Sequence, residues 1–331
     1  MESLETKNPF INGILQAVDY DPAKYIIPEG TRGQRDYVMS RSSLMEFAPR
    51  IGKPTCPRKW RAGRQKDDTS STLWGTIMDA LLLSPEHFDE RFIVQPLTYP
   101  ATKTSTAVKS GECNIGDPIK WNNAATFCKE WKNEAEQTGK IIVSVEQRAD
   151  AELSLERLKQ DDRISEYVSC SQKQVYVTAE YRDKATGIVV KCKALLDLVP
   201  NKDHVDFGKT LADFKTTQCA ENSKWKRSVF DFDYHVQAAW FLDIFVAATG
   251  QDRLEFYHIL QENSAPFETG RRFMESAFLE HGRSTYLAAL QFYCQCLKSN
   301  FWPGYDDVSN NANGLSINGW TSVDLEDWMI K

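Results

Sequence analysis

The sequence predicts a mixed α/β protein of the α+β type, in which a central mixed sheet contains an antiparallel meander and is flanked by helices. The first observation behind this prediction is a run of three apolar or alternating segments, joined by polar stretches, between residues 174 and 216. Strands that follow one another at this spacing usually pair with their neighbours in the chain. The second observation is that segments with apolar residues at helical spacing stand before and after these strands.

Helices are predicted before the strands, because apolar residues recur there at helical spacing, over residues 40–47, 73–83, 124–137 and 145–159. Ser40 is suited to cap the first helix. Pro85 lies just beyond the second helix, where a proline prevents the helix from continuing. Residues 98–120 are rich in Thr, Ser, Gly and Pro, so they are predicted to form a long loop.

The predicted meander consists of strands over residues 174–181, 188–199 and 210–216, with a turn at 183–187. A helix over 233–249 follows it. Gly250 is the natural end of that helix, because glycine readily adopts the left-handed conformation that closes many helices. A fourth strand over 254–261 and a long amphipathic helix over 268–299 complete the predicted elements.

The composition fits a globular protein with a packed core, since 41% of the 331 residues are hydrophobic. A formal net charge of −6 argues against a coat of positive charge, although a local basic groove can still bind nucleic acid. The most apolar stretch, residues 238–248, is too short to cross a membrane. The chain starts without a signal-peptide pattern and its cysteines are mostly scattered, so we expect a cytoplasmic protein with reduced thiols and no membrane partner.

The strongest chemical pattern lies in the second and third predicted strands. Asp213 and Lys215 are two residues apart, so their side chains would project from the same face of a strand. Asp197 lies in the otherwise apolar segment 194–199, where an ionised carboxylate needs a partner or a metal ion. Asp-x-Lys alone is also the pattern of a surface ion pair. An interior Asp followed by Asp-Phe-Lys on the next strand is a rarer combination.

Carboxylates on neighbouring strands would provide the oxygen ligands that Mg²⁺ prefers. The backbone carbonyl of Phe214 lies between the two residues of the Asp-x-Lys pattern. We therefore predict a metal site formed by Asp197, Asp213 and this carbonyl, at which Mn²⁺ would substitute for Mg²⁺. Such an ion neutralises developing charge and activates water in phosphodiester hydrolysis, and Lys215 would orient the water or stabilise the attacked phosphate.

A basic segment precedes the predicted helix over 73–83. Residues 50–66 carry seven basic side chains and no acidic one. Such a segment can be a solvated loop, or it can be a strip that contacts the phosphates of a nucleic acid. In the second interpretation, the contacts to DNA come from Arg58, Lys59, Arg61 and Arg64.

Taken in order, these blocks resemble the RecE (exonuclease VIII) group of the PD-(D/E)xK nucleases, relatives of lambda exonuclease and of the RecB nuclease domain. The matching blocks are residues 40–47, 56–60, 75–85, 191–194, 212–217, 234–239 and 302–305. The resemblance implies a restriction-endonuclease-like core over residues 40–305. An N-terminal extension over 1–39 would precede this nuclease domain, and a C-terminal tail over 306–331 would follow it.

The resemblance also implies roles for individual residues. Asp197 and Asp213 would be metal ligands, and Lys215 would be the catalytic lysine. Gln237 would lie beside the phosphate and hold substrate or water. Two residues of the same helix would help to orient it and would contact DNA, namely Tyr234 and His235.

Three positions depart from the family pattern. Leu196 stands where the motif has Pro, and Phe241 stands where relatives often have Tyr. Asp79 stands where the family has a metal-binding histidine. An anionic oxygen ligand suits Mg²⁺ or Mn²⁺, so we predict that Asp79 binds the same cation. The alternative is a helix-surface residue at a position where this ligand has been lost. Relatives with an iron–sulfur cluster place three cysteines after the core, whereas only Cys294 and Cys296 follow it here, so no cluster is expected.

The resemblance implies a Mg²⁺-dependent exonuclease that digests linear double-stranded DNA from its 5′ ends and leaves 3′ overhangs for recombination. It further implies a ring-shaped homo-oligomer and a single-strand annealing or recombinase protein as a partner. Two alternatives stay open. One is an endonuclease or single-strand nuclease of a host-defence or CRISPR-adaptation system. The other is a catalytically degenerate DNA-binding protein, in which Asp79 and Phe241 mark the lost activity.

Overall fold

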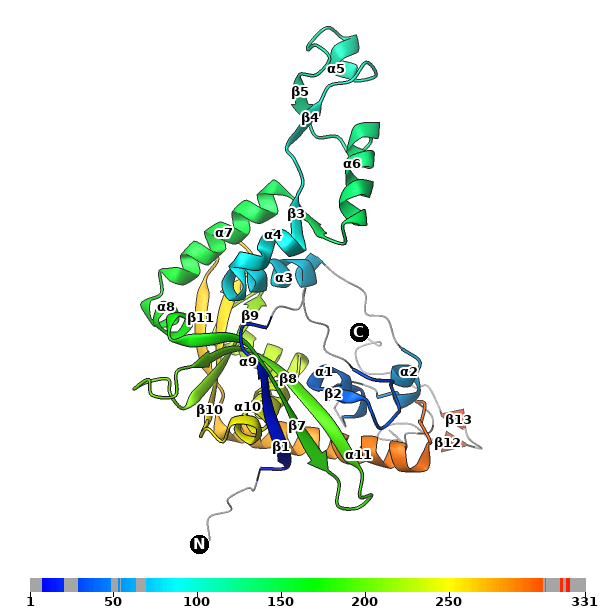
Figure 1. Ribbon diagram of the computed structural model, residues 1–331, viewed down its shortest axis with the longest axis vertical. Coiled ribbons are helices and arrows are strands. Elements are labelled where there is room, and N and C mark those ends of the chain that lie inside the picture. Colours follow the sequence, from blue (N-terminus) through cyan, green and yellow to red (C-terminus); the bar gives the residue numbers. More distant parts are fainter. Residues whose placement is uncertain are drawn as a thin grey trace, which may run out of the picture.

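A seven-stranded mixed sheet runs through the body of the protein (Figure 1). In the computed structural model, the described residues are 8–20, 29–48, 53, 55–63, 70–305, 307, 316–317 and 320–321. The strand order is β1 (Phe10–Ala17), β7 (Ser171–Arg182), β8 (Val189–Pro200), β9 (Thr210–Thr217), β10 (Glu255–Glu262) and β11 (Thr269–Phe273), with β2 (Val38–Ser40) paired to β8. Helices flank this sheet, which confirms the predicted fold class.

The predicted meander is confirmed as β7, β8 and β9, each antiparallel to the next. Val175 lies opposite Leu196 in the first pair, and both side chains are buried. In contrast, β10 runs parallel to β9, with His258 in register with Asp213. A parallel pair needs a crossover connection, and α9 (Asn222–Asp231) and α10 (Tyr234–Thr249) supply it.

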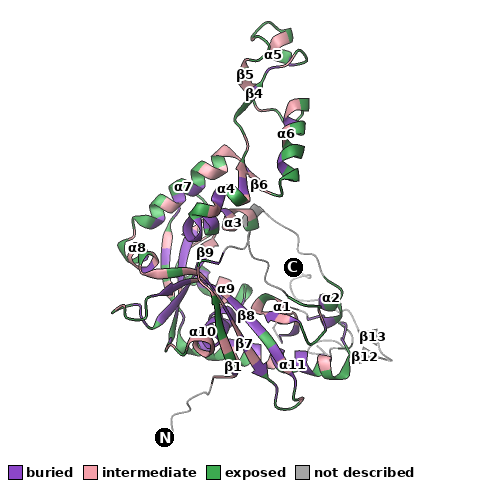
Figure 2. Ribbon diagram, viewed as in Figure 1, coloured by how far each residue is buried: buried purple, intermediate pink, exposed green. Residues whose placement is uncertain are grey.

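Two helical layers cover the sheet (Figure 1). On one side, α1 (Arg41–Leu44), α10 and α11 (Ser276–Ser299) pack with the sheet in a large apolar cluster that includes the fully buried Trp240. On the other side, α3 (Ser70–Leu83), α7 (Val145–Lys159) and α8 (Asp162–Ser169) pack around Phe214. Buried residues accordingly concentrate on the sheet and on the helix faces that meet it (Figure 2).

Several predicted helix ends are confirmed. The Ser40 side chain accepts a hydrogen bond from the backbone N–H of Ser43 and caps α1, which a 3-10 turn, η1 (Met45–Phe47), extends. α3 ends at Leu83, and the next turn, η2 (Pro85–His87), starts on the proline. α10 ends at Gly250, whose φ of 67° is left-handed. Within the described residues, no helix is long and apolar enough to cross a membrane.

Two sequence predictions of secondary structure need correction. The single helix predicted over 268–299 begins instead as β11, and α11 starts only at Ser276. Gly270 pairs with Leu260 of β10, so tertiary pairing overrides the helical spacing of the sequence. The loop predicted over 98–120 contains short elements: β4 (Thr98–Pro100), α5 (Thr106–Lys109) and β5 (Pro118–Lys120).

The segments before and after the core blocks also contribute strands. β1 lies within residues 1–39 and pairs antiparallel with β7 at the edge of the main sheet. β12 (Ser316–Ile317) and β13 (Trp320–Thr321) pair with each other. The main sheet therefore includes a strand from the segment that the sequence marks as an N-terminal extension.

Residues 95–140 form an arm that projects from the body (Figure 1). After α4 (Phe88–Arg91), the chain leaves the body through β3 (Phe92–Val94) and returns through β6 (Ile141–Val143), and these two strands pair in parallel. The arm holds β4, α5, β5 and α6 (Thr126–Gln137). Its packing includes ring contacts with centroids 5.3 to 6.3 Å apart among Tyr99, Trp121, Phe127 and Trp131.

A buried ion pair joins α10 to α11. Asp243 is 7% exposed and accepts hydrogen bonds from Nε and Nη2 of Arg283, both at 2.7 Å, and another from Tyr286. Arg283→Ala is expected to lower the free energy of unfolding by about 3–5 kcal/mol, because it leaves a buried carboxylate without its counter-charge. Urea denaturation measures this loss. Arg163→Ala, which breaks exposed ion pairs to Glu166 and Asp206, is the control and should cost much less, because exposed ion pairs contribute little to stability. Equal losses in both variants would contradict the expectation.

Candidate active site

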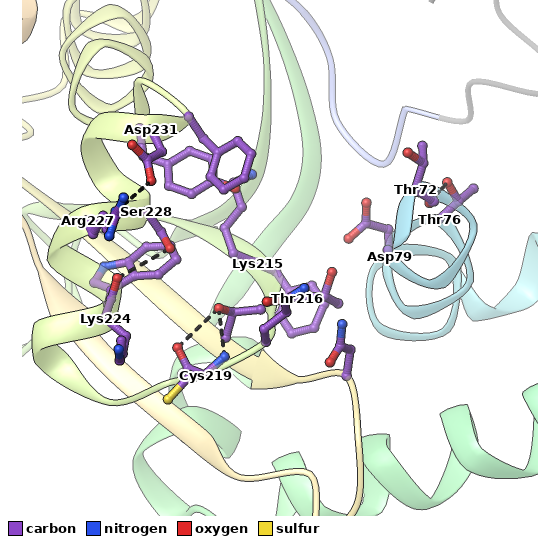
Figure 3. A pocket seen from close by; sticks show the side chains of 18 residues that line it. Thr72, Thr76, Asp79, Lys215, Thr216, Cys219, Lys224, Arg227, Ser228 and Asp231 are labelled. Carbon is purple, nitrogen blue, oxygen red and sulfur yellow. Dashed lines mark hydrogen bonds and ion pairs between the residues drawn. The ribbon is translucent and has the colours of Figure 1, made fainter. Parts of the chain in front are cut away.

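A pocket of about 640 Å³ opens beside β9, between α3 and α9 (Figure 3). Asp79 reaches into it from α3, and Lys215 lies opposite on β9 (Figure 3). The far wall comes from α9 and from the start of α10. The pocket therefore brings together two of the residues that the sequence marks for catalysis, from segments more than a hundred residues apart.

Asp213 and Lys215 share one face of β9, as the two-residue spacing predicts. Asp213 is 2% exposed and its Oδ2 forms an ion pair with Lys215 Nζ. Its Oδ1 accepts a hydrogen bond of 3.1 Å from Nε2 of Gln237 on α10. Gln237 Oε1 in turn accepts one of 3.1 Å from Arg41 at the start of α1. This chain of contacts holds the Asp213 carboxylate in place.

In the structure Gln237 contacts a carboxylate, and the same chain of contacts includes a residue that the sequence analysis missed. Gln237 is buried against Asp213, so its direct contact is the carboxylate. Arg41 was not singled out, although it lies in the serine-rich block over residues 40–47. Nothing in that block predicts that its arginine reaches α10.

Asp197 lies on β8 next to the same strand. Leu198 pairs with Ala212, and in this antiparallel register Asp197 falls opposite Asp213. Asp197 Oδ2 accepts a hydrogen bond of 3.0 Å from the backbone N–H of Phe214. The aspartate in the apolar strand therefore has a backbone partner, and its carboxylate is directed to β9. The Phe214 side chain is buried on the other face of the sheet.

The carboxylates and the lysine influence one another's ionisation. Burial raises the pKa of Asp197 well above its usual range, and the charges of Asp213 and Asp79 add to the effect. Burial also raises the pKa of Asp79 to about 7, with Lys215 opposing and Asp213 adding to the shift. Asp79 is nevertheless open to the pocket, so water there screens part of its shift. The site thus disfavours three separate negative charges.

Lys215 stays protonated in this environment. Burial by itself would lower the pKa of Lys215, but the carboxylates of Asp213 and Asp197 outweigh it and raise the pKa above its usual value. Its Nζ also lies 5.3 Å from the ring centroid of Tyr234. The lysine is therefore a fixed positive charge at the pocket wall, suited to interact with an anionic group.

The donor set fits a hard divalent cation in its chemistry. Carboxylate oxygens are the ligands that Mg²⁺ and Mn²⁺ prefer, and the crowding of Asp79, Asp197 and Asp213 is the charge imbalance that such an ion would relieve. Across the described part of the chain, no three or more His, Cys, Asp or Glu side chains converge closely enough to hold a metal ion. Asp197 and Asp213 are the residues that could hold one, and Asp79 is the third carboxylate that interacts electrostatically with them.

The predicted DNA-binding arginines and lysine are not brought to this pocket. Arg58, Lys59 and Arg61 lie on α2 (Pro57–Arg61) and are exposed. They contact residues near the C-terminal end of the core: Arg58 pairs with Asp307 at 2.6 Å, Lys59 contacts Tyr305, and Arg61 lies over Trp302. Arg64 lies outside the described residues.

The two predicted contacts on α10 have different surroundings. Tyr234 lines the pocket. His235 points away from it and is 3% exposed, stacked on His281 of α11 with its Nδ1 at 3.3 Å from the carbonyl of Val229. A contact of His235 with DNA is therefore not supported, because α11 covers its ring.

The chain is similar to one family model and to a solved structure. No curated protein matches the chain. Among solved structures, the chain is similar to a protein from Eubacterium rectale named "Putative exonuclease", with 17% identity over 85% of this chain and 90% of that chain and a TM-score of 0.49. A family model described as a PDDEXK-like domain of unknown function (DUF3799) matches residues 42–313. This match covers most of the sequence and includes the meander, both strand aspartates and Lys215, so the chain belongs to this PDDEXK-like family and, with it, to the PD-(D/E)xK nuclease superfamily.

Proposed function

We propose that this protein is a divalent-metal-dependent exonuclease that hydrolyses linear double-stranded DNA from its 5′ ends and leaves 3′ overhangs. The observation that carries the proposal is the pocket on β9. Lys215 lines the pocket and pairs with the buried Asp213. Asp197 lies opposite Asp213 on β8, and Asp79 lies across the pocket from Lys215 on α3. Membership of the PDDEXK-like family supports a nuclease and hence a DNA substrate.

Each residue has a part in the proposed chemistry. Asp197 and Asp213 hold the divalent ion, Mg²⁺ or Mn²⁺, with Asp79 and the carbonyl of Phe214 as further ligands. When bound, such an ion supplies charge neutralisation and an activated water. The ammonium of Lys215 donates hydrogen bonds to the attacked phosphate and stabilises the charge that develops on its oxygens. Gln237, fixed by Arg41, keeps the Asp213 carboxylate in the correct orientation.

The finer parts of the proposal rest on the resemblance of the ordered sequence blocks to the RecE group. They comprise digestion from the 5′ end, preference for linear duplex, a ring-shaped homo-oligomer, and delivery of the 3′ strand to an annealing or recombinase protein. The position of Asp79 is the main departure from that group. Its place in the pocket, facing Lys215, supports a role as a ligand rather than as a surface residue.

The experiment that tests the proposal uses linear duplex DNA labelled at either the 5′ or the 3′ end, with Mg²⁺ or Mn²⁺. We expect rapid release of the 5′ label as short products, slow loss of the 3′ label, and no cleavage with EDTA. A closed circular duplex of the same sequence is the control and should stay intact. Cleavage of the circle at a similar rate would replace the exonuclease by an endonuclease. Intact linear DNA with both metals would overturn the nuclease proposal.

A further inference from the structure

Three aromatic rings form a continuous stack at the wall of the pocket. Tyr234 lies between Trp225 and Phe232, with centroids 5.2 Å and 5.5 Å away and interplanar angles of 20° and 30°. Trp225 is 3% exposed and Phe232 is 59% exposed. This aromatic stack therefore runs from the core to the surface and ends on a phenylalanine that is open to solvent.

The exposed end of the stack is held by its backbone. The carbonyls of Phe230 and Asp231 accept hydrogen bonds of 3.0 Å and 2.5 Å from Lys53 Nζ. The carbonyl of Phe232 accepts a longer one of 3.5 Å from Arg41. The next residue, Asp233, has a left-handed φ of 56° and pairs with Lys53 at 3.3 Å. These contacts fix the turn that carries Phe232, so its ring stays exposed to solvent. On a freely moving loop, the ring could fold against the protein.

The same pocket combines this aromatic surface with positive charge. Lys215, Lys224 and Arg227 line it together with Phe232 and Tyr234. Lys224 is exposed. Arg227 forms an exposed ion pair of 3.6 Å with Asp231, a contact that contributes little. Proteins that bind single-stranded nucleic acid combine aromatic rings, on which the bases stack, with cationic side chains that contact the phosphate backbone.

The pocket is large enough to hold a nucleotide. Its volume of about 640 Å³ is in the range of sites that enclose a small molecule.

We propose that Phe232 is a stacking platform for an unpaired base of the DNA strand that is cut. This inference rests on the proposed function and adds a base-binding residue to its site, in the pocket that Lys215 also lines. The aromatic stack supports the base from below, and Lys224 and Arg227 attract the backbone.

Binding of a short single-stranded oligodeoxynucleotide, measured by fluorescence anisotropy in EDTA, tests the proposal without cleavage. Phe232→Ala is expected to weaken binding about 5- to 150-fold, the range that loss of one base stack covers. Phe232→Trp should bind like the wild type, because it keeps a ring face. Phe273→Ala is the matched control, since Phe273 is 64% exposed and lies outside this pocket, and it should not change binding. Thermal unfolding of each variant verifies that it is folded.

An abasic site moved along the oligonucleotide separates stacking from other causes. At one position, loss of the base should weaken wild-type binding and leave Phe232→Ala unaffected. The proposal is overturned if the wild type does not bind the strand or if Phe232→Ala binds it as well as the wild type does. It is also overturned if the abasic site weakens wild-type binding equally at every position. If the protein cleaves duplex DNA but Phe232→Ala does not weaken oligonucleotide binding, this inference fails and the proposed function stands. If binding depends on a base and on Phe232 but no DNA is cleaved, the proposed function fails and the binding role of Phe232 stands.

Discussion

Lys215→Ala is expected to lower the single-turnover rate of DNA cleavage by about 10²- to 10³-fold, the cost of removing one group that stabilises transition-state charge. Lys215 lines the pocket and pairs with the buried Asp213, and the two strand carboxylates keep it protonated. Its loss removes the ammonium from the attacked phosphate and also leaves Asp213 without its ion pair. The rate is measured with saturating enzyme on end-labelled linear duplex.

Lys224→Ala is the control for this variant, because Lys224 lines the same pocket from α9 and is exposed. It is expected to weaken DNA binding and to leave the rate of the bound complex nearly unchanged. Thermal unfolding tests whether Lys215→Ala is still folded. Equal rates of Lys215→Ala and wild type with both Mg²⁺ and Mn²⁺ would show that this lysine takes no part in catalysis.

Metal binding is expected to strengthen by up to about tenfold between pH 6 and pH 8 through Asp79, because burial raises the pKa of this ligand to about 7 and the carboxyl must lose its proton before it binds. Asp197, whose pKa is also raised, adds to this dependence. Calorimetric titration with Mn²⁺ at each pH measures it. Asp79→Asn should flatten the pH dependence and weaken binding at pH 8 by about 10- to 100-fold.

The same shift makes a prediction for stability without metal. Folding raises the pKa of Asp79 above its unfolded value, so the folded state binds more protons and its stability falls as the pH rises from about 4 to 7. Asp79→Asn removes this fall, and at pH 8 it should be more stable by about 1 kcal/mol, a small value because Asp79 is open to water.

The double variant Asp197→Ala, Asp213→Ala is the control for metal binding and should bind no Mn²⁺. If Asp79→Asn binds Mn²⁺ as the wild type does, Asp79 is a helix-surface residue.

Strand geometry was the most predictable part of the site. A period of two places Asp213 and Lys215 on one face whatever surrounds them, and their ion pair in the structure confirms it. The short turns between the predicted strands likewise indicate an antiparallel meander, and β7, β8 and β9 form one. These features depend on residues close in the sequence, so local patterns are sufficient to predict them.

The arrangement of helices around the strands was less predictable. Residues 235 to 245 of α10 are all buried, so the helix has no polar stripe that would show which side meets the sheet. Gln237 therefore turned out to face Asp213, while His235 faces α11. α9 was missed because its position depends on long-range packing of Trp225 and Val229. The aromatic stack of Trp225, Tyr234 and Phe232 therefore became visible only in the structure.

The arm over residues 95–140 has a consequence for how this protein can vary. Because β3 and β6 pair with each other, the chain leaves the body and re-enters it at one place. The arm is therefore a closed loop whose two ends are held together at the body. The entropy of closing a flexible loop grows only with the logarithm of its length, about 0.6 kcal/mol for each doubling. Insertions and deletions in the arm are therefore tolerated far better than in β9. One residue added to β9 between Asp213 and Lys215 would turn their side chains to opposite faces of the sheet.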